Sequence, residues 1–227
     1  NALVSDFTEN GWSDIYICND YNQGDQFMIN EGRLNFKNEL RERVDHTSFY
    51  SMGSDVADIN NDGWLDFLTL DMAFGDHYRS KTNMESMRPE LFWRLVREGN
   101  HFQYAVNNLQ LNNGYGYFSE IAHLSGISHT DWSWSPLFID LDSDSHKDLV
   151  ISNGFLKDLR NNDFLTKMKI TGEDKLNQLS FEEINRLAPS TPIGNYIYKN
   201  NGDLTFDNVS AGSMFSEKGF STGMAYG

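Results

Sequence analysis

The chain contains the stretch Asp58-Ile59-Asn60-Asn61-Asp62-Gly63-Trp64-Leu65-Asp66, in which oxygen-bearing side chains occupy positions one, three, five and nine. This is the spacing of a calcium-binding loop, because Ca²⁺ takes about six to eight oxygen ligands and alternate residues of a tightly curled loop can supply them. The predicted ligands are the side chains of Asp58, Asn60, Asp62 and Asp66 and the backbone carbonyl of Trp64. Gly63 stands at position six, where the chain must turn with a positive φ that glycine adopts without steric cost. The apolar residues 67–70 that follow indicate a buried strand rather than the helix that follows an EF-hand loop.

The same pattern occurs twice more, and we call residues 6–14, 58–66 and 140–148 the first, second and third loops. The predicted ligands of the third loop are Asp140, Asp142, Asp144, the carbonyl of His146, and Asp148. Those of the first loop are Asp6, Thr8, Asn10, Trp12 and Asp14. The first loop has only two carboxylates, so we expect two calcium sites and a weak or unfilled third one at residues 6–14. In the third loop Ser145 replaces the glycine, which costs about 1–2 kcal/mol at positive φ, and we expect the extra carboxylate to offset this cost once an ion is bound.

A second signature accompanies the loops and defines the repeating unit. Residues 27–36, 109–118 and 196–206 each read as a strand, an Asn/Gly turn and an aromatic residue that restarts a strand, which is typical of a β-hairpin. A recurring order of loop, strand and hairpin indicates a repeat protein. We therefore predict an all-β fold in units at residues 1–52, 53–134 and 135–220, with the start of a further unit at 221–227 and a longer array beyond it.

Two helical insertions interrupt this pattern, at residues 72–105 and 155–193. Pro89 and Gly99 bracket one predicted helix, which Phe92, Trp93 and Val96 would pack down onto the sheets. A capping box of Ser180 and Glu183 begins the other. The first insertion could also form part of a binding face, because functional residues often lie on loops held by a rigid scaffold, although packing explains it more simply.

Composition narrows the possible functions. Hydrophobic residues make up 39% of the chain and the formal net charge is −15, which argues against nucleic-acid binding because phosphates require clustered Lys and Arg. No apolar run is long enough for a transmembrane segment. The single cysteine, Cys18, lies in an apolar stretch and is predicted to be a buried packing residue. Loops of this kind suit millimolar extracellular calcium, so we expect an extracellular, outer-membrane or periplasmic location.

The loops and hairpins together resemble those of the FG-GAP/VCBS repeat proteins. The stretches Asn153-Gly154-Phe155-Leu156-Lys157-Asp158 and Asn195–Asp203 are similar to the bacterial branch associated with ASPIC/UnbV domains, the cartilage acidic protein type. The resemblance implies a β-propeller like that of integrin α chains, with about three four-stranded blades of a ring that usually has seven. Three blades cannot close such a ring. The two outermost sheet edges would then expose unpaired backbone groups, which further blades or another segment must cover.

Three functions remain open at this point. The first is a non-enzymatic, calcium-stabilised scaffold or binding module for a protein or glycan, favoured by the lack of a recognisable catalytic set. The second is a polysaccharide lyase or hydrolase, since paired carboxylates can cleave sugars. Residues 129–134 are the stretch where such chemistry could lie, although strand packing explains them more simply. The third is a subunit of an outer-membrane uptake assembly.

Overall fold

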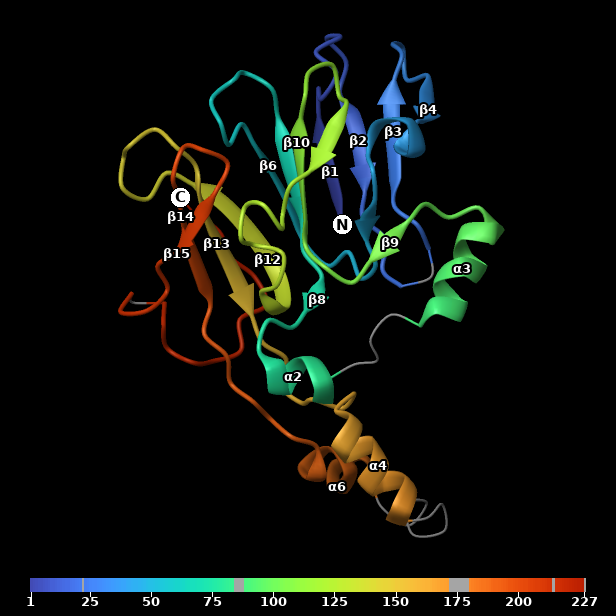
Figure 1. Ribbon diagram of the computed structural model, residues 1–227, viewed down its shortest axis with the longest axis vertical. Helices are drawn as coiled ribbons and strands as arrows, with labels where there is room; N and C mark the ends of the chain where they lie inside the picture. The colour runs from blue at the N-terminus through green and yellow to red at the C-terminus, as the bar shows by residue number, and fades with distance from the viewer. Residues whose placement is uncertain (22, 84–87, 172–179, 214, 227) are drawn as a thin grey trace.

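The computed structural model describes residues 1–21, 23–83, 88–171, 180–213 and 215–226 and consists mostly of β-strands (Figure 1). Residue 227, and residues 84–87 and 172–179 of the two insertions, lie outside the described part. Three antiparallel sheets follow one another, and in each the strands pair in chain order. The first contains β1 (Ala2–Ser5), β2 (Asp14–Ile17), β3 (Gln26–Asn30) and β4 (Phe36–Asn38). The second contains β6 (Ser54–Ala57), β7 (Asp66–Thr69), β10 (Asn108–Asn112) and β11 (Phe118–Glu120). The third contains β12 (Asp131–Ile139), β13 (Asp148–Asn153), β14 (Tyr196–Asn200) and β15 (Phe206–Asn208).

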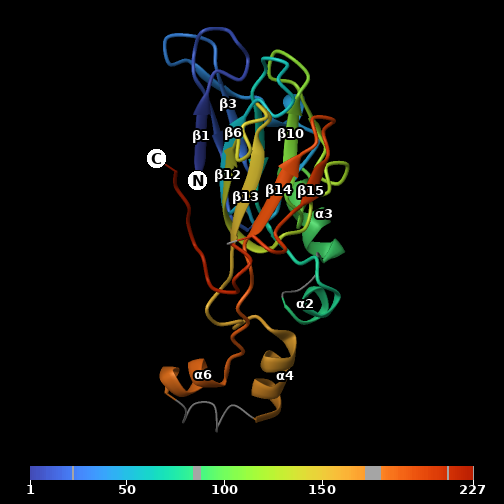
Figure 2. The same cartoon turned by 90° about the vertical axis from the view of Figure 1, so that its left-hand side faces the viewer.

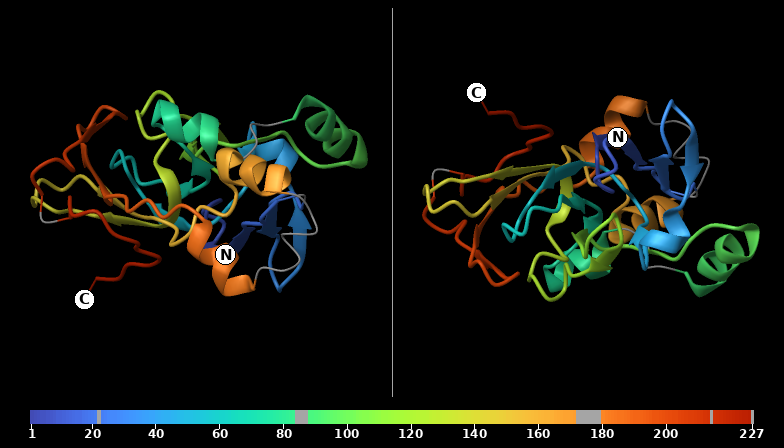
Figure 3. Two further views of the ribbon diagram at one scale, coloured as in Figure 1. Left: turned by 90° about the horizontal axis from the view of Figure 1, so that it is seen from below. Right: turned by 90° about the horizontal axis from the view of Figure 1, so that it is seen from above.

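The first strands of the three sheets lie side by side, and the sheets fan outward from them (Figure 3). Strand β6 contacts both β1 and β12. The backbone N–H of Phe138 donates to Asp55 Oδ2 across 2.7 Å, which joins β12 to β6. A Cβ on Gly53 would lie 2.0 Å from the carbonyl oxygen of Trp134, so only glycine allows this approach of the second and third sheets.

The core fills the spaces between neighbouring sheets. Phe67 of β7 belongs to an aromatic cluster between the first two sheets, where it packs on Tyr16 and Phe118 with ring centroids 4.4 and 4.9 Å apart. The next residue, Leu68, belongs to an aliphatic cluster shared with the third sheet. Successive residues of a strand point to opposite faces, so β7 is buried on both sides. A strand follows each loop directly, as predicted, and the buried strand predicted after the second loop is confirmed as β7.

The third sheet departs from the expected four strands. Strand β8 (Met72–Ala73) comes from the start of the first insertion. It pairs with β12 and is the fifth strand of the third sheet. The insertion ends at β9 (Gln103–Tyr104), which pairs in parallel with β5 (Thr47–Ser48). These short pairings join neighbouring units and were not predicted, because two-residue strands have no periodicity to recognise.

The insertions carry more helix than the sequence indicated. The first contains α2 (His77–Thr82) as well as the predicted α3 (Pro89–Glu98), and the second contains α4 (Asn162–Thr171) and α6 (Phe181–Leu187). A single turn, α1 (Leu40–Arg43), follows the first sheet. Figure 2 shows α4 and α6 at the end of the molecule opposite the first, second and third loops. No helix in the described ranges has the length and apolar character needed to cross a membrane.

The predicted helix boundaries are confirmed where capping signals mark them. Helix α3 begins at Pro89 and ends before Gly99, which has a φ of 105°. The capping box of Ser180 and Glu183 is present at the start of α6. The expected packing of Trp93 is wrong, because this side chain is 52% exposed and Leu95 is the buried residue of α3.

Candidate metal centres

The three loops share one local structure, and the position-one aspartate organises it. In the second loop Asp58 Oδ1 and Oδ2 accept the backbone N–H groups of Asp62 and Gly63 at 3.1 and 2.9 Å. Asp140 and Asp6 accept the equivalent two N–H groups at 2.8–3.2 Å. Each loop therefore curls around its own first carboxylate.

The positive φ predicted at position six is confirmed in every loop. The angles are 85° at Gly11, 91° at Gly63 and 75° at Ser145. Ser145 thus adopts the left-handed conformation despite its Cβ. Position four is also left-handed, at Glu9, Asn61 and Ser143. That second requirement was not predicted, although Asn is among the residues that tolerate it best.

The position-nine aspartates are buried and tie each loop to the hairpin of its own sheet. Asp66 Oδ2 accepts the N–H of Ile59 at 2.9 Å, and its Oδ1 accepts the N–H of Asn112 at 2.8 Å. Asp148 repeats both bonds with Leu141 and Asn200 at 3.0 and 2.9 Å. Asp14 repeats them with Phe7 and Asn30 at 3.1 and 2.8 Å. These carboxylates are therefore structural as well as candidate ligands.

The hairpin asparagines were predicted only as turn residues, and the structure gives two of them a role between sheets. The side-chain amide of Asn112 donates to the carbonyl of Phe7, in the loop of the preceding sheet, at 3.1 Å. Asn200 donates in the same way to the carbonyl of Ile59 at 2.8 Å. Both acceptors stand at position two of a loop. The recurrence of Asn at the same place in each hairpin was the available signal, but its partner lies about a hundred residues away or more.

Position seven was predicted to supply a carbonyl, and its side chain has a further use. A Cβ built on the hairpin glycines Gly32, Gly114 and Gly202 would lie 3.1–3.6 Å from a ring atom of the position-seven residue. Those residues are Trp12, Trp64 and His146. A large ring therefore covers the hairpin glycine in each sheet, and Trp64 also packs against Tyr115 with a centroid distance of 4.9 Å.

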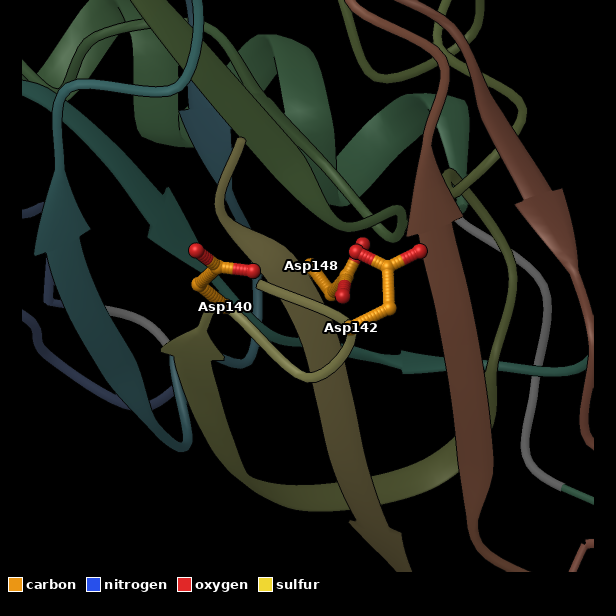
Figure 4. Close-up of side chains that lie close together, drawn as sticks. All are labelled: Asp140, Asp142 and Asp148. Carbon is orange, nitrogen blue, oxygen red and sulfur yellow. The ribbon is translucent and has the colours of Figure 1, made fainter. Parts of the chain in front are cut away.

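The third loop brings its predicted ligands together most closely. Asp140, Asp142 and Asp148 each have a carboxylate oxygen within 4.8 Å of the others, and Figure 4 shows the three side chains around the loop. Within the described ranges this is the only group of three or more acidic, His or Cys side chains with that spacing. In the second loop the Asn60 amide donates to Asp62 at 2.9 Å, which holds these two predicted ligands side by side. The carboxylate oxygens of Asp140, Asp142 and Asp148, within 4.8 Å of one another, match the needs of a hard cation.

In the first loop, the predicted ligands at positions three and five bond elsewhere. The Thr8 hydroxyl donates to Asp14 Oδ2 at 3.2 Å, and the Asn10 amide donates to the carbonyl of Asn30 at 3.0 Å. This arrangement leaves Asp6 as the carboxylate at the mouth of the loop. It is consistent with the expectation of weak binding there, which stays a prediction.

A lysine stands beside the third loop and was not predicted. Lys199 Nζ forms a salt bridge with Asp142 and lies 3.5 Å from Asp144 Oδ2. The backbone N–H of His146 and the charge of Lys199 together lower the pKa of Asp144. The equivalent residues of the other two hairpins are Leu111 and Ile29, so this cation is specific to the third loop.

Burial acts in the opposite direction on two of the position-nine carboxylates. Loss of hydration raises the pKa of Asp66 to about 7, with smaller contributions from the charges of Asp62 and Asp58. Burial also raises the pKa of Asp14. A cation beside these two groups would favour their charged form, so the protein part of the first and second loops alone does not fully compensate their negative charge.

A further buried carboxylate gives a testable dependence of stability on pH. Asp25 accepts hydrogen bonds from Tyr16 Oη at 2.8 Å and Ser51 Oγ at 3.0 Å, and burial raises its pKa to about 6. An unfolded aspartate titrates near pH 4. The folded protein therefore holds the proton more tightly, and this contribution to stability is complete below about pH 4 and is lost as the pH rises to about 6.

We expect the wild-type protein to lose up to about 3 kcal/mol relative to Asp25→Asn across this window, as measured by urea unfolding from pH 4 to 7.5. The exposed Asp207→Asn variant is the control, and a wild-type-like profile for Asp25→Asn would contradict the assignment.

Of residues 129–134, the one stretch considered for catalysis, residues 131–134 lie in β12, and His129 and Thr130 precede this strand. Asp131 is buried and paired with Arg79, whose Nε and Nη2 donate to its two oxygens at 2.6 and 2.9 Å. The Trp132 ring stacks on Phe155 with centroids 4.5 Å apart. Cys18 is buried as predicted, and burial raises the pKa of its thiol to about 12.

Comparison with known proteins bears on the first part of the chain. Residues 6–69 match the model of the FG-GAP-like repeat family, and this range contains strands β2 to β4 of the first sheet, the first two loops, and strands β6 and β7 of the second sheet. The match supports an FG-GAP repeat protein. A search of curated proteins found no match. Among solved structures, a lectin of Agrocybe aegerita, studied for its specific recognition of non-reducing terminal N-acetylglucosamine, aligns with a TM-score of 0.41 and 15% identity. The alignment covers 91% of this chain and 36% of the lectin chain.

Proposed function

We propose that this protein is a calcium-binding, non-catalytic β-propeller segment whose second and third loops each hold one Ca²⁺. The observation that carries the proposal is the convergence of Asp140, Asp142 and Asp148 within one loop. The second loop has the same hydrogen-bonded framework, which supports an equivalent site there. The bound ions would neutralise crowded carboxylates and hold the entry to the second strand of each sheet.

The wider role that we propose is a scaffold or binding module for a protein or glycan, extracellular, at the outer-membrane surface or in the periplasm. Support comes from the net charge of −15 and from loops that suit calcium at millimolar concentration. The fanned arrangement of three successive meander sheets supports blades of a larger ring, in the manner of the ASPIC/UnbV-associated type. The bonds from Asn112 and Asn200 to the preceding loops would then set the spacing between blades.

Titration calorimetry tests the metal sites directly. We expect the wild-type protein to bind two Ca²⁺ ions with dissociation constants of about 0.1–1 mM. The Asp58→Ala and Asp140→Ala variants should each bind one. An absence of binding up to about 10 mM calcium, or unchanged stoichiometry in both variants, would overturn the proposal.

The lysine beside the third loop makes a sharper test of that site. Lys199 adds a positive charge near Asp142 and Asp144 that a calcium ion must overcome or displace. Because the side chain is partly exposed, solvent weakens the repulsion. We expect Lys199→Met to tighten calcium binding at the third loop about threefold to tenfold, as measured by the same calorimetry. Lys147→Met removes an equal charge from the same loop at an exposed position without a described salt bridge, and an equal gain in that control would contradict the role of Lys199.

A further inference from the structure

A cavity of about 560 Å³ lies at the end of the molecule opposite the loops. Its walls come from the turn after β2, the segment after β5, helix α3 with the residue before it, Ala105, and the start of the second insertion including α4. Figure 1 shows α3 at the side of the sheets next to β9, and α4 further down at the end of the molecule. The volume falls within the roughly 300–1,000 Å³ typical of small-molecule sites. Both helical insertions therefore contribute to one concave site.

The charge of this cavity is opposite to that of the whole protein. The chain has 33 acidic and 18 basic residues, yet three basic residues line the cavity and its described lining contains no Asp or Glu. The three are Arg88, Arg160 and Lys169. Arg160 and Lys169 form no salt bridge with another residue of the described ranges. A local positive site in an acidic protein selects anions, because the remaining surface repels them.

Aromatic rings supply the apolar part of the cavity. Tyr21 and Tyr50 lie with centroids 5.7 Å apart, and Tyr50 also packs edge-on against Phe49 at 4.6 Å. On the opposite side, Phe92 of α3 stacks on Tyr104 at 5.5 Å, which fixes the orientation of its ring. Burial raises the pKa of Tyr50 to about 12, so its hydroxyl stays protonated and adds no negative charge.

The backbone at Tyr21 is held in an unfavourable conformation. Its φ is 71°, in the left-handed region that large side chains avoid. The N–H of Tyr21 donates to the carbonyl of Phe49 at 3.1 Å, which holds the turn against the segment after β5. Strain of this kind tends to gather at binding sites, where it fixes a side chain in place. Here the turn holds the Tyr21 ring beside Phe49 and Tyr50, at centroid distances of 5.9 and 5.7 Å.

We propose that this cavity binds an acidic glycan through a uronic acid residue. Guanidinium groups bind carboxylates with paired, charge-assisted hydrogen bonds, and aromatic faces pack against the apolar faces of a pyranose ring while its hydroxyls remain hydrated. The proposal rests on the role of the protein as a binding module and names the ligand class. It does not require metal in the loops, since these lie at the other end of the fold.

Calorimetric titration with trigalacturonate tests this proposal, with maltotriose as the neutral control at the same free calcium concentration. We expect measurable binding of trigalacturonate that weakens with added salt, and at least tenfold weaker binding of maltotriose. Arg160→Ala, Lys169→Ala and Tyr21→Ala should each weaken binding about tenfold. Arg94→Ala is the matched control, because Arg94 lies on α3 with its side chain 58% exposed and outside the cavity. It should bind as the wild type does.

Three results would overturn the proposal: no trigalacturonate binding at millimolar concentration, equal binding of maltotriose, or equal losses in Arg160→Ala and Arg94→Ala. Benzoate provides a further arm, and binding of benzoate without trigalacturonate would show an aromatic anion site instead of a glycan site. The same titrations on the Asp58→Ala and Asp140→Ala variants separate the two proposals. Glycan binding that persists while each variant binds one calcium ion fewer leaves this proposal standing.

Discussion

Calcium at about ten to a hundred times its dissociation constant is expected to raise the melting temperature of this protein by about 10 °C. Each filled site contributes about 1.4–2.7 kcal/mol at such concentrations, and two sites together contribute about 4 kcal/mol. For a domain of this size, 1 kcal/mol corresponds to roughly 2–4 °C. The physical source is relief of repulsion among Asp140, Asp142 and Asp148, which lie within 4.8 Å of one another. Differential scanning calorimetry with 10 mM CaCl₂ or with a chelator measures the shift.

Two controls make this result specific. Magnesium at the same concentration should give a much smaller shift, because Mg²⁺ demands near-octahedral geometry and gives up its water reluctantly. The double variant Asp58→Asn, Asp140→Asn should lose most of the calcium effect. Equal melting temperatures with calcium and chelator would contradict the proposed role of the ions, as would a double variant that still responds fully.

The Asp14→Ala substitution is expected to lower the free energy of unfolding by about 4 kcal/mol even when calcium is absent. Asp14 is fully buried and accepts bonds from Phe7 N, Thr8 N, Thr8 Oγ1 and Asn30 N. Each buried donor left without a partner costs about 1–3 kcal/mol. The raised pKa of Asp14 shows that burial of the charge also has a cost, so the net loss is smaller than the sum of these bonds. Urea unfolding in the presence of a chelator, followed by tryptophan fluorescence, measures it.

Asp6→Ala in the same loop is the matched control. Asp6 accepts the N–H groups of Asn10 and Gly11, which water can replace because these donors are exposed. We expect this variant to lose only about 1 kcal/mol. Equal losses in the two variants would contradict the structural role of the position-nine aspartate, and so would a loss in Asp14→Ala that appears only when calcium is present.

Local sequence signals predicted the parts of the fold that short-range chemistry controls. The left-handed turn at position six is present even at Ser145, because the curled loop imposes it on any residue there. The capping box at Ser180 and the glycine after α3 marked helix ends for the same reason. The helices α2 and α4 were missed. In α2 the buried residue is Thr82 and Tyr78 is exposed, and in α4 Leu165 and Ile170 are exposed, so neither helix has a clear apolar stripe to recognise.

The sequence by itself determined the repeat: where each loop curls and which strand follows it, since these depend on residues fewer than ten positions apart. Only the tertiary structure decided how the repeats join. The bonds from Asn112 to Phe7 and from Asn200 to Ile59 connect residues 105 and 141 positions apart. The placement of Lys199 at the third loop and the convergence of Arg160 and Tyr50 on one cavity are of the same kind. Contacts over such distances depend on how whole sheets pack against each other, which no local pattern of residue types records.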